Sequence, residues 1–131
     1  MSEPIRVVIA DDEPDMRLLL RMQLGGRPDF TVVGEAADGD EAVTEAVEGA
    51  ADVVVMDLLM PGTSGFEGIA MLTGDHPDIA VVAYTAVAGE YVREEMSRLG
   101  IDLVLKSGDI EPLAQALLGA VGTSDRALPV D

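Results

Sequence analysis

Short runs of β-branched and aliphatic residues alternate along the chain with segments in which apolar residues recur at helical spacing. The runs predict five strands, at Ile5–Ala10, Thr31–Val33, Asp52–Met56, Ile79–Tyr84 and Ile101–Leu105. Most are nearly continuous apolar runs, which is typical of parallel strands covered on both faces. The pattern therefore predicts an α/β fold.

Between the strands, apolar residues three or four positions apart predict helices. The expected helical faces are Met16, Leu19, Leu20 and Leu24; Ala42, Val43, Ala46 and Val47; Phe66, Ile69 and Ala70; a weaker segment at about Glu90–Leu99; and Ile110, Leu113, Ala114, Leu117, Leu118 and Val121. We expect Asp109 to cap the last helix.

The periodicity ends near the C-terminus. Residues 1–121 are expected to form one domain, and residues 122–131 a flexible tail or the start of a linker. Strand–helix units joined by right-handed crossovers give an open parallel sheet, in which ligands bind beyond the carboxyl ends of the strands.

Composition narrows the classes of function. Acidic residues number 25 against 8 basic ones, for a formal charge of −17, which opposes binding to nucleic-acid backbones or anionic membranes. The absence of cysteine excludes disulfides and thiolate metal sites, and the single His76 excludes a histidine pair. With no signal peptide or long apolar stretch in the sequence, we expect a cytoplasmic protein.

Acidic residues follow two of the predicted strands. Asp11 and Asp12 follow the first strand, and Asp57 follows the third. Two charges about 4 Å apart repel by roughly 4 kcal/mol at an effective dielectric of about 20, so a cation is expected among these carboxylates. Oxygen ligands without histidine or cysteine favour Mg²⁺. The alternative is that these acids are loop or capping residues, with Asp12 or Asp15 capping the first helix.

Two further polar residues lie at the ends of the fourth and fifth predicted strands. Lys106 is the one lysine of the chain and follows the fifth strand, where its ammonium group could neutralise the carboxylates or pair with a phosphoryl oxygen. Thr85 ends the fourth strand and offers a hydroxyl donor. The alternative interpretation is that Lys106 is an ordinary surface lysine and that Thr85 is an ordinary strand residue. Tyr84 and Tyr91 are interpreted as packing or partner-surface residues.

A metal ion, an ammonium group and a hydroxyl around one carboxylate suit an aspartate that accepts a phosphoryl group. Asp57 is the best nucleophile candidate, because it ends the central apolar strand, and Asp11 and Asp12 would hold the metal. The alternatives are a Mg²⁺-dependent phosphohydrolase with an aspartyl nucleophile and an interaction module that is never phosphorylated. A flavin-binding protein is disfavoured by the acidic first loop.

These residues lie in stretches that resemble the receiver domain of two-component response regulators. The matching stretches are IRVVIADDEPDMRLLL, VVGEAADGDEAV, DVVVMDLLMPGTSGFEGI, VVAYTA and the strand end at Lys106. The resemblance implies a flavodoxin-like (βα)5 three-layer sandwich with a parallel five-stranded sheet in the order 2-1-3-4-5. The second stretch is most similar to a subfamily that usually carries a C-terminal helix-turn-helix DNA-binding domain, so transcription control is the implied output.

The resemblance assigns a role to each site residue. Asp57 would accept a phosphoryl group from a sensor histidine kinase, and Thr85 and Lys106 would contact that group. Asp12, Asp57 and the Leu59 backbone carbonyl would bind Mg²⁺ directly, and Asp11 mainly through water. The implied protein is a signalling phosphoacceptor rather than a turnover enzyme, with a homodimer as a candidate assembly.

Two departures from the family pattern affect these expectations. Leu103 occupies the position of the usual aromatic switch residue, so ring rotation cannot transmit the signal. In the family that the chain resembles, the positions of Leu59 and Val87 modulate the attack of water on the acyl phosphate. Because both are apolar, we expect slow self-dephosphorylation.

Overall fold

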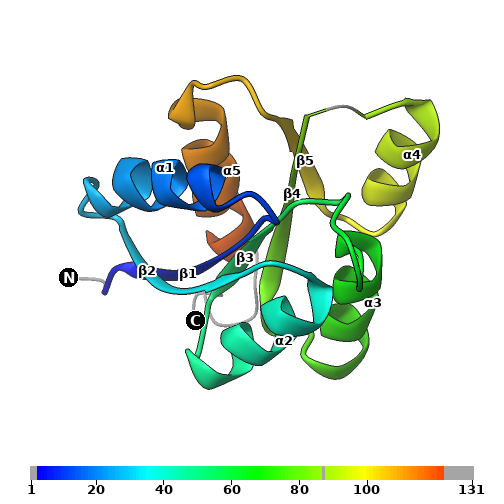
Figure 1. Cartoon of the computed structure of the whole chain (residues 1–131), viewed down its shortest axis with the longest axis horizontal. Coiled ribbons are helices and arrows are strands. Elements are labelled where there is room, and N and C mark those ends of the chain that lie inside the picture. Colours follow the sequence, from blue (N-terminus) through cyan, green and yellow to red (C-terminus); the bar gives the residue numbers. More distant parts are fainter. Residues whose placement is uncertain (1–2, 87, 123–131) are drawn as a thin grey trace, which may run out of the picture.

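The computed structural model describes residues 3–86 and 88–122, in which five strands and five helices alternate (Figure 1). The strands are β1 (Ile5–Ala10), β2 (Phe30–Ala36), β3 (Val53–Met56), β4 (Ala80–Thr85) and β5 (Asp102–Leu105). The helices are α1 (Pro14–Gly25), α2 (Gly39–Glu48), α3 (Gly65–Asp75), α4 (Glu90–Arg98) and α5 (Ile110–Gly122). The predicted α/β alternation is confirmed.

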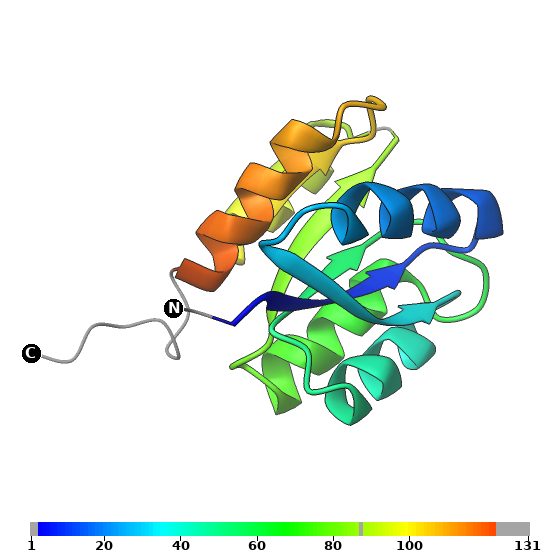
Figure 2. The same cartoon turned by 90° about the vertical axis from the view of Figure 1, so that its left-hand side faces the viewer.

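The five strands form one parallel sheet in the order β2-β1-β3-β4-β5. Helices α1 and α5 cover one face, and α2, α3 and α4 cover the other (Figures 1 and 2). The expected flavodoxin-like three-layer sandwich and its strand order are therefore confirmed. Because the strands are parallel, their carboxyl ends lie along one edge of the sheet.

The sheet separates two apolar cores. In β1 and β3, Val8 and Val54 face α2, α3 and α4, whereas Val7 and Val53 face α1 and α5, and all four are fully buried. Alternation of side chains across the pleat explains why these strands are continuous apolar runs. Charged side chains can then enter only where the strands end.

The β2 strand is longer than predicted. It extends from Phe30 to Ala36 instead of Thr31–Val33, whereas the other strand ends differ from the predictions by at most one residue. The apolar run stops at Val33, but backbone pairing with β1 continues beyond it, from Val8 with Gly34 to Ala10 with Ala36. Backbone hydrogen bonding rather than side-chain pattern therefore sets the end of this edge strand.

The buried helical faces are narrower than the periodicity predicts. Leu19 and Val47 were expected on the apolar faces of α1 and α2, but they are 41% and 46% exposed. Helix α1 buries Leu20 and Leu24, one turn apart, and Leu19 lies at the flank of that stripe. A helix that packs on one side of a sheet covers only this narrow stripe, so flanking apolar residues remain at the surface.

The first residues of α5 and α1 show which of the predicted helix caps are present. The Asp109 carboxylate accepts a hydrogen bond from the Glu111 backbone N–H at 3.0 Å, which confirms the expected cap of α5. Helix α1 instead begins after Glu13, whose side chain forms no cap hydrogen bond, with Pro14 in the first helical position. Neither Asp12 nor Asp15 therefore caps α1.

The predicted C-terminal boundary lies at the end of α5. Gly122 is the last residue of α5, and residues 123–131 lie outside the described part, so the tail or linker stays a prediction. None of the described helices is long and apolar enough to cross a membrane.

Helix α3 begins in close contact with the backbone that carries Asp57. A Cβ atom at Gly65 would overlap the carbonyl oxygen of Asp57 and lie 2.8 Å from the Cα atom of Leu58. We expect Gly65→Ala to lower the free energy of unfolding in urea by about 1–3 kcal/mol.

Gly74→Ala is the matched control in the same helix, because nothing lies within 4 Å of its added Cβ. It should change the free energy of unfolding by less than about 1 kcal/mol, in the stabilising direction. Equal effects of the two substitutions would show that the contact at Gly65 does not constrain the packing.

Candidate functional site

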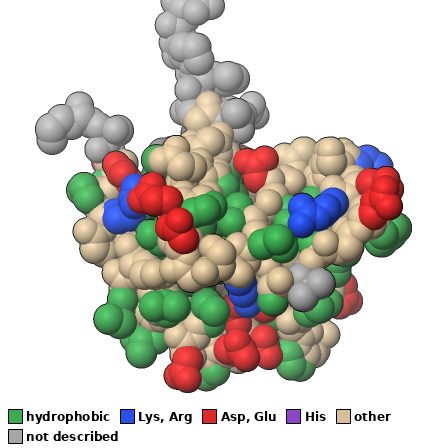
Figure 3. All heavy atoms as spheres, turned by 90° about the horizontal axis from the view of Figure 1, so that it is seen from above, with side chains coloured by type: hydrophobic (Ala, Val, Ile, Leu, Met, Phe, Trp, Pro, Cys, Tyr) green, Lys and Arg blue, Asp and Glu red, His purple; other side chains and the backbone are tan. Residues whose placement is uncertain are grey.

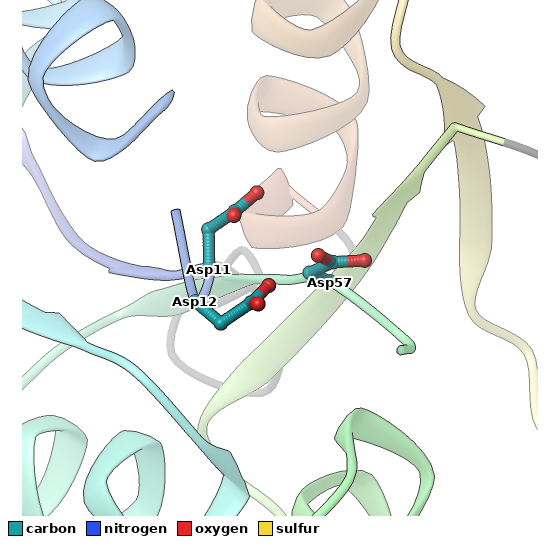
Figure 4. A group of neighbouring side chains, drawn as sticks. All are labelled: Asp11, Asp12 and Asp57. Atoms are coloured by element: carbon teal, nitrogen blue, oxygen red, sulfur yellow. The ribbon is translucent and has the colours of Figure 1, made fainter. Parts of the chain in front are cut away.

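Three carboxylates meet where β1 and β3 end. The strands pair Ala10 with Met56, so the next residues, Asp11 and Asp57, are neighbours across the sheet. The backbone N–H of Asp57 donates to the carbonyl of Ala10 at 3.0 Å, which holds the two strand ends together. One oxygen from each of Asp11, Asp12 and Asp57 lies within 4.8 Å of the others (Figure 4).

Lys106 reaches this cluster from the end of β5. Its Nζ atom is 2.6 Å from Oδ2 of Asp11 and 3.3 Å from Oδ2 of Asp57, so one ammonium group bridges two carboxylates. Its backbone N–H donates to the carbonyl of Thr85 at 2.9 Å, which continues the pairing of β4 with β5. The lysine side chain is 14% exposed, so this is not the plain surface lysine of the alternative reading.

The space-filling view shows the surroundings of the strand ends from above. Acidic side chains gather near the lower centre of this face, next to a basic one, with hydrophobic side chains on either side (Figure 3). An uneven charge distribution of this kind leaves a local excess of negative charge, which favours a cation.

Burial and neighbouring charges shift the pKa values of Asp57 and Lys106. Burial, together with the neighbouring charge of Asp11, raises the pKa of Asp57, although Lys106 and the Leu59 N–H act in the opposite direction. Burial lowers the pKa of Lys106, but its hydrogen bonds and charge interactions with Asp11 and Asp57 outweigh this and raise it above its ordinary value. The charged form of Lys106 is thus stabilised, whereas burial disfavours the charged form of Asp57.

The donor set fits a hard divalent cation. The cluster offers carboxylate oxygens alone, two of them from buried aspartates. Mg²⁺ binds through one or two protein carboxylates together with water and phosphate oxygens.

Thr85 and the loop residues surround the cluster. Thr85 is buried at the end of β4, next to the strand that carries Lys106. The Leu59 side chain is 69% exposed, and its N–H donates weakly to Asp57 Oδ1 at 3.4 Å. Leu103 is half-buried against the core beneath α4. Val87 lies outside the described residues.

An arginine at the site was missed from the sequence. Arg17 of α1 donates to the backbone carbonyl of Asp11 at 2.5 Å and pairs with the Glu35 carboxylate at 3.3 Å. These contacts tie α1 and β2 to the loop that carries the aspartates. Nothing in the sequence pattern distinguishes Arg17 from the surface arginines, so only the structure could reveal this contact.

A comparison with protein-family models identifies the family of this chain. The pattern of the response regulator receiver domain matches residues 7–118 of the chain. The chain therefore belongs to the response regulator receiver domain family, as the resemblance indicated.

Curated relatives include regulators and enzymes. The transcriptional regulatory protein LiaR of Bacillus subtilis is 32% identical over 117 residues, which cover 88% of this chain and 56% of that protein. A protein-glutamate methylesterase/protein-glutamine glutaminase of Thermotoga maritima is 36% identical over 104 residues, which cover 78% of this chain and 30% of that protein. The chain thus spans about half or less of these relatives.

Solved structures agree with the fold. The signal receiver domain of the putative response regulator NarL from Mycobacterium tuberculosis matches with a TM-score of 0.86 and 26% identity, covering 93% of this chain and 99% of that one. The response regulator domain of Thermotoga maritima CheB matches with a TM-score of 0.81 and 28% identity, covering 92% and 98%.

The raised pKa of Asp57 predicts a stability cost for its charge. The folded state holds the Asp57 proton more tightly than the unfolded chain, so the native protein loses stability as the pH rises through this pKa. With a chelator present, Asp57→Asn should therefore unfold at a temperature a few degrees higher than the native chain at neutral pH. The difference in unfolding temperature between Asp57→Asn and the native chain should become smaller at acidic pH. Thermal unfolding measured over a series of pH values tests this.

The exposed Asp78 provides the control for the loss of one negative charge. Asp78→Asn should follow the native pH profile. A stability difference between native chain and Asp57→Asn that stays constant with pH would contradict the assignment of the effect to Asp57.

Proposed function

We propose that the chain is a phosphoacceptor in which Asp57 takes a phosphoryl group from the phosphohistidine of a sensor histidine kinase. The observation that carries this proposal is the Lys106 ammonium group, 3.3 Å from the Asp57 carboxylate and held by Asp11. In the transfer, a bond forms from an Asp57 oxygen to phosphorus while the phosphorus–nitrogen bond breaks. The imidazole keeps the electron pair and takes up a proton.

Mg²⁺ would bind at the acidic cluster. Asp12, Asp57 and the backbone carbonyl of Leu59 are its direct ligands in this proposal, with Asp11 acting mainly through water. The cation supplies charge screening and alignment between the anionic donor and the anionic acceptor. Asp11 also orients Lys106, because its carboxylate is the nearer partner of the amine.

The phosphoryl group would change the balance of charge at the strand ends. It adds about −1.5 to −2 charges. Lys106 and Thr85 would then contact the phosphoryl oxygens, which draws the ends of β4 and β5 toward Asp57. Leu103 replaces the aromatic switch residue, so we propose that the signal passes through these strand ends and α4 rather than through a ring rotation.

The output would be a change in protein contacts. Because the relatives include transcriptional regulatory proteins of which this chain spans about half, we propose transcription control through a C-terminal DNA-binding domain, with a homodimer as a candidate assembly. The chain itself would act in the cytoplasm without touching DNA. Its enzyme-like activity would be limited to its own phosphorylation and slow dephosphorylation, the latter because the exposed Leu59 side chain cannot orient a water molecule.

The central prediction concerns one covalent adduct. With Mg²⁺ and a small phosphodonor, the native chain should gain a single phosphoryl group in its intact mass, and the adduct should outlast minutes after the donor is removed. Asp57→Asn should gain none, and Asp12→Ala should need a higher Mg²⁺ concentration. Asp78→Asn, on an exposed turn, should behave as the native chain.

The rival functions give other results. Steady release of inorganic phosphate without an adduct would favour a phosphohydrolase, and no reaction at all would favour an unphosphorylated interaction module. An adduct that persists in Asp57→Asn would move the acceptor to another residue and contradict the proposal.

A further inference from the structure

One buried polar side chain beside the site has no role so far. Tyr84 is the residue of β4 immediately before Thr85 and is 4% exposed. Its phenolic hydroxyl has no hydrogen-bond partner among the described residues. The one fully buried side-chain atom without a partner in the described part of the chain is Nε of Arg27, so the Tyr84 hydroxyl keeps some exposure and can take a partner that arrives at the site.

The sheet register brings Tyr84 next to the acidic cluster. Strands β3 and β4 pair Met56 with Ala83, so the next residues, Asp57 and Tyr84, are neighbours. Tyr84 pairs with Val104 on the other side, and Lys106 follows Val104 by two residues. Because alternate residues share a face of the sheet, Lys106 leaves β5 on the face of Tyr84.

The tyrosine ring and its charged neighbours lie on the α1 and α5 side. Tyr84 packs in the core that contains Leu113 and Leu117 of α5. Burial raises the pKa of Tyr84, and its hydroxyl is close enough to Lys106 and Asp11 for the first to lower that pKa and the second to raise it. The ring therefore lies in the core on the α1 and α5 side of the sheet, within range of the charges of Lys106 and Asp11.

The hydrogen-bond donors of Lys106 are not all used. An ammonium group has three donors. Two of them point to Asp11 and Asp57, and within the described part of the chain no acceptor takes the third. An ammonium donor without a partner and a phenolic oxygen without a partner thus lie on the same side of the sheet.

We propose that Tyr84 is a positioning residue for Lys106, with its phenolic oxygen accepting the third hydrogen bond of the ammonium group in the phosphorylated state. The inference rests on the proposed function, because it concerns how Lys106 is held at a phosphoryl group on Asp57.

Lys106 needs a further hydrogen-bond partner because Asp11 would interact with two cations. The same carboxylate holds Lys106 and belongs to the cluster that would share its charge with Mg²⁺. A carboxylate that neutralises a cation attracts an ammonium group less strongly, so Lys106 needs a second anchor. A phenol anchors the amine without cancelling its charge, which leaves that charge available to the phosphoryl oxygens.

Tyr84→Phe removes only the hydroxyl, and Tyr91→Phe is the matched control, because Tyr91 is 74% exposed on α4. A neutral hydrogen bond contributes about 0.5–1.5 kcal/mol, so Tyr84→Phe should slow adduct formation from a small phosphodonor about threefold to tenfold. Tyr91→Phe should leave the rate unchanged. In a Lys106→Met background, Tyr84→Phe should cause no further loss, because its effect passes through the amine.

Tyrosine emission provides a readout that needs no phosphorylation. The chain has two tyrosines and no tryptophan, so in Tyr91→Phe the emission comes from Tyr84 alone. Titration with Mg²⁺, and then with beryllium fluoride as a phosphoryl mimic, should change this emission. The change should be lost when Lys106→Met is added. The emission measurement tests the inference even if the Lys106→Met variant forms too little adduct for its rate of formation to be measured.

The outcomes separate the two claims. No adduct on the native chain overturns the proposed function, and this inference with it. A normal adduct on the native chain with an equal rate in Tyr84→Phe overturns the inference alone. The inference is also overturned if Tyr84→Phe slows adduct formation equally in the native and the Lys106→Met background. An emission change that does not depend on Lys106 would overturn it as well, since either result would mean that Tyr84 acts only through packing.

Discussion

The Lys106 ammonium group between Asp11 and Asp57 is the interaction on which the site depends. Without it, three carboxylates with oxygens within 4.8 Å of one another would repel at a largely buried position. With it, the carboxylates lie together in the folded chain, although burial still raises the pKa of Asp57. Carboxylate oxygens held this close together suit a hard divalent cation.

The parallel sheet supplies the geometry for this interaction. Register alone makes Asp11, Asp57 and Tyr84 neighbours on successive strands, and the last strand delivers Lys106 from 49 residues farther along the chain than Asp57. Around them, Gly65 lets α3 lie against the backbone of Asp57, so the packing of this helix and the position of Asp57 are linked.

Much of this arrangement could be predicted from the sequence, because its strongest signals are local. Continuous apolar runs located the strands, and acids and a single lysine directly after them located the cluster. The contacts of Arg17 and Tyr84 could not be predicted, since both depend on which strands are neighbours and on which face each side chain lies. The exposure of Leu19 and the length of β2 were missed for a related reason: neighbouring elements, rather than periodicity, decide how much of a helix or strand is covered.

The most direct measurement of the central claim follows the one lysine of the chain by magnetic resonance. Selective labelling of lysine gives a single side-chain signal, which belongs to Lys106. In a metal-free sample, this signal should titrate at a pKa above that of an exposed lysine, and Asp11→Asn should lower that pKa. A signal that titrates as an exposed lysine and ignores Asp11→Asn would contradict the account.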